Sequence, residues 1–175
     1  MLLDKYLRSS NKRVLFAGDA VGGPMFTHAA ELHASVILKN FFSPFKTPIS
    51  FDKFSWVTFS FPEIATFGLS EENLKRKNLR YKVLKKSFSD DDRALTDRYS
   101  NSKIFVYIDK KRRILGGSII APNAGELVQE FLLAMNANLT IDKIFSKIYP
   151  YPAASRINKS VVSSVFADKL NSNFN

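Results

Sequence analysis

The sequence predicts an α+β fold, a mixed antiparallel sheet with helices, preceded by a short strand–turn–helix unit. Runs of β-branched and aromatic residues separated by turn residues occupy much of residues 56–120, which is typical of a sheet. The clearest amphipathic helix pattern follows, in residues 124–135. A length of 175 residues, of which 45% are hydrophobic, suffices for one domain or for a domain and a fragment of another.

The first unit is predicted to contain a strand, a turn and a helix. Residues 13–17 form a mainly apolar run that stops at Gly18 and Asp19, as a buried strand stops at a turn. From Phe26 onward the spacing predicts a helix, with Thr27 available as its N-cap. The apolar positions that recur at offsets of three and four, and that we expect to face inward, are Ala30, Ala34, Ile37, Leu38 and Phe41.

A strand, a turn and a helix cannot by themselves bury both faces of a parallel sheet. We therefore interpret residues 1–45 as the last piece of a larger α/β domain. Residues 46–53, with Pro48 and little periodicity, are interpreted as a linker. Residues 54–168 then form a second domain, and residues 169–175 are expected to be a frayed tail.

The second domain begins with the sheet. Strands are expected at residues 56–61, 64–69 and 80–88, and two more flank the charged turn at residues 109–113 as a hairpin. Between the second and third strands, Ser70 is placed to cap a short helix. Acidic residues occupy the first turn of that helix and basic residues its last, which complements the helix dipole.

Three helices are predicted after the sheet. The strongest pattern, at offsets 0, 3, 4, 7, 8 and 11, comprises Ala124, Leu127, Val128, Phe131, Leu132 and Met135. A short helix is expected at residues 141–147. After a loop with the sequence Tyr-Pro-Tyr-Pro, a last helix carries Ile157, Val161, Val165 and Phe166.

Composition excludes several chemistries. Without cysteine these residues can hold no disulfide, thiolate nucleophile or redox dithiol, and with two histidines we expect no metal site. The net charge is +10, and residues 75–86 hold seven basic and no acidic side chains. We interpret such runs as solvated surface and expect no specific nucleic-acid binding. No apolar run suggests a membrane span or a signal peptide, so a cytoplasmic protein is expected.

Several blocks of sequence carry a family resemblance. Residues 13–31 resemble the second flavin-binding motif of the FAD-dependent pyridine nucleotide-disulfide oxidoreductases, which include lipoamide dehydrogenase, glutathione reductase and mercuric reductase. Further blocks follow in the family's order, at residues 56–59, 62–72, 92–94, 113–126, 148–152 and 158–159. The resemblance implies that residues 1–45 end an FAD-binding domain and that residues 54–168 are the family's dimerisation domain.

The resemblance also implies a partial FAD site in the first unit. Asp19 matches the aspartate that hydrogen-bonds a ribityl hydroxyl of FAD, and Gly18 would allow the cofactor's close approach. Phe26, Thr27, His28 and Ala29 match the start of a helix whose N-terminus would stabilise negative charge on the reduced flavin. His28 is then either a wall residue of this pocket or an ordinary structural histidine.

Two candidate catalytic positions follow from the resemblance. Tyr151 occupies the position of the catalytic histidine of lipoamide dehydrogenase and glutathione reductase, and mercuric-reductase-like members also have tyrosine there. Arg156 replaces the glutamate that orients the histidine. Tyrosine, with a pKa near 10, is a poor base but a usable proton donor. Because Arg156 also removes the carboxylate that would orient a base, classical lipoamide or glutathione chemistry is not expected.

The remaining parts of the family's machinery do not occur in these residues. The Gly-x-Gly-x-x-Gly turn, the paired redox cysteines and the NAD(P)H site are absent from this sequence. The resemblance therefore implies a C-terminal part that provides homodimerisation and a portion of the flavin site, completed by a possible separate N-terminal FAD- and NAD-binding polypeptide. A non-catalytic dimerisation or interaction module without flavin remains the alternative.

Overall fold

A computed structural model of the chain describes residues 2–173, and the side chains of residues 2–167. The chain forms two compact units, Met1–Phe51 and Asp52–Asn175. The division between them falls inside the segment interpreted as a linker, residues 46–53. The exact bounds of the two domains and the frayed tail stay predictions: the backbone of the last helix is helical as far as Asn173, and residues 174–175 lie outside the described residues.

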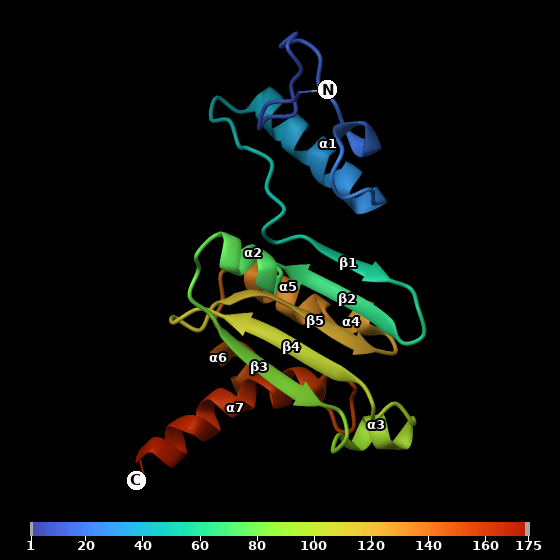
Figure 1. Cartoon of the computed structure of the whole chain (residues 1–175), viewed down its shortest axis with the longest axis vertical. Coiled ribbons are helices and arrows are strands. Elements are labelled where there is room, and N and C mark those ends of the chain that lie inside the picture. Colours follow the sequence, from blue (N-terminus) through green and yellow to red (C-terminus); the bar gives the residue numbers. More distant parts are fainter. Residues whose placement is uncertain (1, 174–175) are drawn as a thin grey trace. The chain divides into compact units, whose positions relative to one another are not determined.

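The first unit contains the 3₁₀ helix η1, Gly18–Val21, and the helix α1, Thr27–Phe42 (Figure 1). The predicted strand at residues 13–17 is wrong. Only an isolated bridge between Arg8 and Leu15 forms there, and Val14 and Leu15 are exposed. A strand needs a neighbour for its backbone hydrogen bonds, and the described residues of this unit supply only that single bridge.

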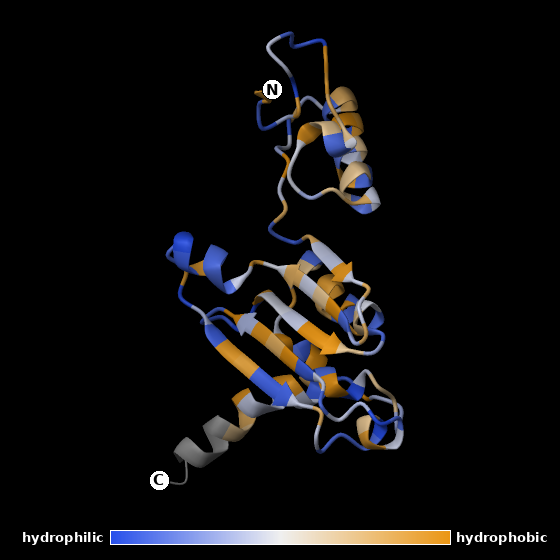
Figure 2. Ribbon diagram, turned by 45° about the vertical axis from the view of Figure 1, so that its right-hand side comes forward, coloured by the Kyte–Doolittle hydropathy of each residue, from blue (hydrophilic) through white to orange (hydrophobic). Residues whose placement is uncertain are grey.

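The predicted inner face of α1 is also wrong. Its buried residues are Ala29, His33, Val36 and Asn40. Leu38 and Phe41 are exposed, and hydrophobic and hydrophilic residues alternate along this helix (Figure 2). The buried face was missed because it includes two polar side chains, each of which finds a partner within the unit: His33 accepts from the amide of Gly18, and Asn40 bonds the backbone of Thr47.

The second unit confirms the predicted fold class. Its five strands are β1 Ser55–Thr58, β2 Glu63–Gly68, β3 Lys82–Ser87, β4 Lys103–Ile108 and β5 Ile114–Ala121. They pair antiparallel in the order β1-β2-β5-β4-β3. The predicted hairpin joins β4 and β5, where Asp109 accepts hydrogen bonds from the backbone N–H groups of Lys111 and Arg113.

The helices of the second unit are α2 Glu71–Arg76, α3 Asp92–Thr96, α4 Ala124–Leu127, α5 Gln129–Asn136, α6 Ile141–Ser146 and α7 Arg156–Asn173. Ser70 caps α2, as predicted, by accepting from the amide of Asn73. Helix α3 was not predicted, and Asp91 caps it. The helix expected over residues 124–135 is divided into α4 and α5 by Val128.

Helices α4 to α7 cover one face of the sheet and enclose the core (Figure 1). Alternate residues of the strands point into this core, so Phe67 stacks on Phe131 of α5 with ring centroids 5.2 Å apart. Phe67 faces Gly117 across the β2–β5 pair. A Cβ at Gly117 would collide with the carbonyl oxygen of Phe105 and with the Phe67 ring, which explains the glycine in β5.

Candidate functional site

The turn between residues 17 and 22 requires glycine at its start. Gly18 has φ +68°, a left-handed conformation that glycine adopts without a steric penalty. A Cβ at this position would meet only the Cβ of Ala30, at an ordinary 3.8 Å. The backbone conformation, rather than lack of space within the unit, is therefore the reason for Gly18. Asp19 follows in η1, which packs against α1.

His33 fixes this turn from α1. Its Nδ1 accepts a hydrogen bond of 3.1 Å from the backbone N–H of Gly18, and the side chain is fully buried with an edge-to-face contact to Phe51. Burial lowers the pKa of His33, so the neutral ring with its proton on Nε2 is favoured. The sequence alone does not indicate this role of His33. Its position four residues after Ala29, on the same helix face, was the available signal.

The start of α1 carries the candidate cofactor residues. The helix begins at Thr27, and its N-cap is Phe26, which provides no side-chain hydrogen bond, so Thr27 is not the cap that was predicted. The rings of Phe26 and His28 stack at 5.3 Å and are exposed, whereas Ala29 is buried against the rest of the unit. The structure thus presents a helix N-terminus and an aromatic pair at the surface.

Asp19 is exposed, and within the described side chains its carboxylate makes no hydrogen bond or ion pair. A carboxylate in this state can accept hydrogen bonds from hydroxyl groups. A helix N-terminus without a side-chain cap can stabilise negative charge on a ligand. The first unit therefore offers donor and acceptor groups that fit the ribityl chain and ring edge of a flavin.

Tyr151, in the loop before α7, is held by residues from two elements. Its hydroxyl donates a hydrogen bond of 3.0 Å to Oδ2 of Asp92 in α3, and the guanidinium of Arg156 lies over its ring, 5.3 Å from the centroid. The hydrogen bond and the charge of Asp92 raise the pKa of Tyr151. With 67% of its surface exposed, Tyr151 is an outward-facing proton donor.

Asp92 lies in the family-like block at residues 92–94, and the sequence alone indicates no role for it. It supplies a carboxylate to the candidate tyrosine from 59 residues away along the chain. Helical spacing cannot indicate a contact of this range. Only the fold brings α3 next to the Tyr-Pro-Tyr-Pro loop.

Glu130 of α5 fixes the other side of this loop. Its carboxylate accepts hydrogen bonds from the hydroxyl of Tyr149 at 2.6 Å and from Nδ2 of Asn158 at 3.0 Å, and it pairs with Lys147 at 2.9 Å. Burial and the Glu130 carboxylate raise the pKa of Tyr149. These bonds tie α5, the loop and α7 together, so the backbone on both sides of Tyr151 is anchored.

In residues 2–173, the helices are too short or too polar to cross a bilayer. Across the side chains that the structure describes, histidine, aspartate and glutamate form no group of three or more that could hold a metal ion.

Comparison with known proteins agrees with the fold. Residues 54–161 match the family model of the pyridine nucleotide-disulphide oxidoreductase dimerisation domain. The chain resembles two solved structures at low sequence identity. For LpdA from Mycobacterium tuberculosis the TM-score is 0.84 and the identity 18%, and the match covers 93% of this chain and 36% of that one. For the HOCl-induced flavoprotein disulfide reductase RclA from Escherichia coli the TM-score is 0.80 and the identity 20%, and the match covers 93% of this chain and 38% of that one.

Relatives in sequence include two kinds of enzyme. The chain is 29% identical to the mercuric reductase of Bacillus cereus over 86% of its own length and 24% of that protein. It is 32% identical to mitochondrial dihydrolipoyl dehydrogenase 1 of Arabidopsis thaliana over 93% of its length and 32% of that protein. It thus spans a third or less of these relatives. The match over residues 54–161 places the chain in the pyridine nucleotide-disulphide oxidoreductase family, through its dimerisation domain.

Proposed function

We propose that the chain provides subunit association and part of the flavin site of an FAD-dependent, mercuric-reductase-like NAD(P)H:disulfide oxidoreductase. The observation that carries this proposal is the outward-facing Tyr151, held between Asp92 and Arg156 on a dimerisation domain. In a homodimer such a loop can reach the partner's active site. Since Asp92 raises its pKa, Tyr151 stays protonated at neutral pH and acts as a donor rather than as a base.

The first unit contributes the flavin contacts in this proposal. Bound FAD would pass electrons from NAD(P)H to a disulfide or a similar acceptor. Asp19 would accept a hydrogen bond from a hydroxyl of the ribityl chain, and the N-terminus of α1 would stabilise negative charge on the flavin ring. His33 keeps Gly18 and Asp19 in place. Phe26, Thr27 and His28 would line the site at the exposed start of the helix, next to the buried Ala29.

The redox disulfide and the NAD(P)H site have to come from residues outside these 175, because this sequence contains no cysteine and no Gly-x-Gly-x-x-Gly turn. We propose a separate FAD- and NAD-binding polypeptide as their source. That polypeptide would determine which acceptor receives the electrons and whether NADH or NADPH supplies them. A cytoplasmic location is part of the same proposal.

The proposal is tested by purifying the tagged chain from its native cell and recording the visible spectrum and the masses of bound partners together. We expect a yellow complex that contains a cysteine-bearing polypeptide, with two copies of this chain by sedimentation. A colourless chain, alone or paired only with itself, would refute the flavin role and leave the non-catalytic dimerisation module.

A matched pair of variants tests the residue assignment. Asp19→Ala should lower the FAD content of the purified complex, because the ribityl hydroxyl loses its acceptor. Glu31→Ala removes an equally exposed carboxylate from α1 and should leave the FAD content unchanged. Equal FAD occupancy in both variants would contradict the role of Asp19 and leave the association function intact.

A further inference from the structure

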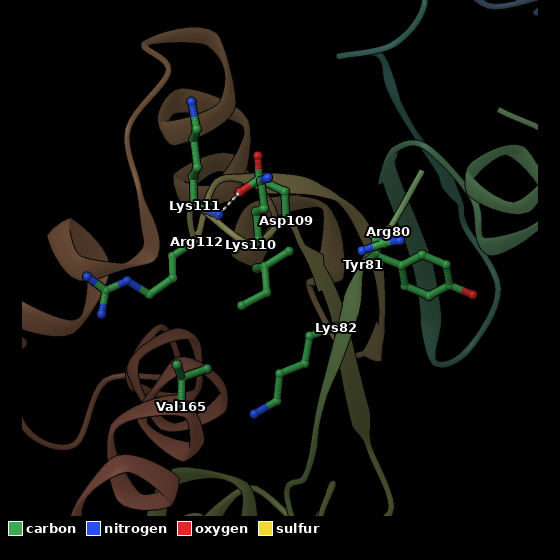
Figure 3. Close-up of a pocket in the computed structure, with 9 residues that line it drawn as sticks. Arg80, Tyr81, Lys82, Asp109, Lys110, Lys111, Arg112 and Val165 are labelled. Carbon is green, nitrogen blue, oxygen red and sulfur yellow. Dashed lines mark hydrogen bonds between the residues drawn. The ribbon is translucent and has the colours of Figure 1, made fainter. Parts of the chain in front are cut away.

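A pocket of about 600 Å³ lies at the hairpin end of the sheet, away from the Tyr151 loop. Three segments form it: the turn between β4 and β5, the residues that lead into β3, and α7 (Figure 3). Ile108 and Val165 give it an apolar part. The cationic residues that line it are Arg80, Lys82, Lys110, Lys111 and Arg112.

The acidic residue in the lining, Asp109, does not neutralise this cluster. Its carboxylate accepts hydrogen bonds from the backbone N–H groups of Lys111 and Arg113 and from Nε of Arg113. Burial acts to raise the pKa of Asp109, but these hydrogen bonds and the charge of Arg113 outweigh it and lower the pKa. Asp109 is therefore ionised and paired with Arg113, a residue that is not among those lining the pocket.

The cations differ in how firmly they are held. Arg112 pairs with Asp142 at 3.0 Å and lies over the ring of Phe166, so its position is fixed. The side chains of Arg80, Lys110 and Lys111 make no hydrogen bond or ion pair with the other side chains that the structure describes. Like charges gathered around one hollow repel one another, and a bound anion relieves that repulsion.

We infer that this pocket binds an oligophosphate group, free or as the phosphate tail of a nucleotide. Arg112 is half-buried and the other four cations are exposed, so each contact with an anion is weak and screened by solvent. A single phosphate offers too little charge to engage several of these side chains at once. A chain of two or three phosphates carries several negative charges and can reach cations from the hairpin and from β3 together.

The test is calorimetric titration of the full chain at low salt with phosphate, pyrophosphate, tripolyphosphate and ATP. We expect affinity to rise steeply from phosphate to tripolyphosphate. If ATP binds as tightly as tripolyphosphate, the free oligophosphate is sufficient for binding. If ATP binds more tightly than tripolyphosphate, the ligand is a nucleotide. Binding of duplex DNA without binding of tripolyphosphate would overturn the inference, as would equal affinities for phosphate and tripolyphosphate.

Variants localise the site. Lys110→Gln with Lys111→Gln should weaken tripolyphosphate binding by about tenfold, since two exposed ion pairs are lost. Arg80→Gln, on a different segment, should weaken it by a smaller factor. The control, Lys39→Gln with Lys103→Gln, removes the same charge from exposed positions outside the pocket and should change affinity less than about twofold. An equal loss in the control would show a net-charge effect and refute the site.

Discussion

The two units bury their hydrophobic residues to very different degrees. In Asp52–Asn175 the sheet and α4 to α7 share a continuous core that includes Phe67, Phe131 and Ile157, each fully buried. In Met1–Phe51 the buried hydrophobic residues are few, while large apolar side chains are exposed: Val14, Leu15, Met25, Leu38, Phe41, Phe42 and Phe45. The second unit has the continuous core of a domain, whereas the described residues of the first unit leave much of its apolar surface uncovered.

The largest test of this comparison is Phe131→Asp. A charge placed where the Phe67 and Phe131 rings stack should destabilise the second unit by at least about 4 kcal/mol and unfold or dissociate it. Leu133→Asp, two residues away and 69% exposed, should cost less than about 1 kcal/mol. Urea denaturation and equilibrium sedimentation measure both. A folded dimer in the Phe131→Asp variant would show that the core is assigned wrongly.

A smaller loss is expected from Glu130→Leu. Without the carboxylate, the hydroxyl of Tyr149 and Nδ2 of Asn158 lose an acceptor inside the protein, at a cost of about 2–3 kcal/mol. Glu126→Leu, at an exposed position of α4, is the matched control. If the two variants unfolded at the same urea concentration, the Glu130 hydrogen bonds that join α5, the loop and α7 would make no contribution to stability.

In the first unit the expected effects are local. His33→Leu removes the acceptor of the Gly18 N–H and should destabilise the turn by about 1 kcal/mol, seen as faster hydrogen exchange of the Gly18 amide. The amides of β4 and β5 should keep their protection. Loss of protection in those strands as well would mean that the two units do not unfold separately.

The same histidine makes the turn sensitive to pH. Because the pKa of His33 is lowered in the folded unit, the unfolded unit binds a proton more readily, and stability falls as the pH drops below about 6.5. The loss continues until the pH passes the lowered pKa of the folded state. Gly18 exchange, corrected for the intrinsic rate, should therefore accelerate between pH 7.5 and 5.5 in the wild type but not in His33→Leu.

The smallest structural effect is expected at the tyrosine. Asp92→Asn removes the charge that raises the pKa of Tyr151, so this pKa should fall toward its ordinary value near 10 while the stability changes by less than about 0.5 kcal/mol. Asp97→Asn, which breaks an ion pair with Arg93 just after the same helix, is the control. NMR titration of the Tyr151 ring measures both, and identical curves would refute the pairing with Asp92.

Local chemistry explains which elements the sequence could predict. Ser70 predicts α2 because its side chain caps that helix. Asp109 predicts the hairpin because its carboxylate accepts a hydrogen bond from the backbone of the turn. The face of α1 was missed because apolar residues were expected inside. That expectation fails when a helix buries His33 and Asn40 and exposes Phe41.

The candidate site was predictable only in part. The resemblance indicated Asp19, Tyr151 and their neighbours, but not what holds them. His33 lies 15 residues from Gly18, and Asp92 lies 59 residues from Tyr151. Contacts of this kind arise when tertiary packing brings elements together, and no periodicity in the sequence encodes them.

The strand order has a consequence for how copies of the protein meet. Strand β3 is an edge of the sheet, and it carries Lys82, Lys85 and Lys86. Two copies that joined along this edge would bring rows of ammonium groups together, and the repulsion opposes open-ended growth of a shared sheet. The opposite edge, β1, has only four residues and offers a short template. Association through side chains is thereby favoured over strand addition, which protects a sheet-based protein from fibrous aggregation.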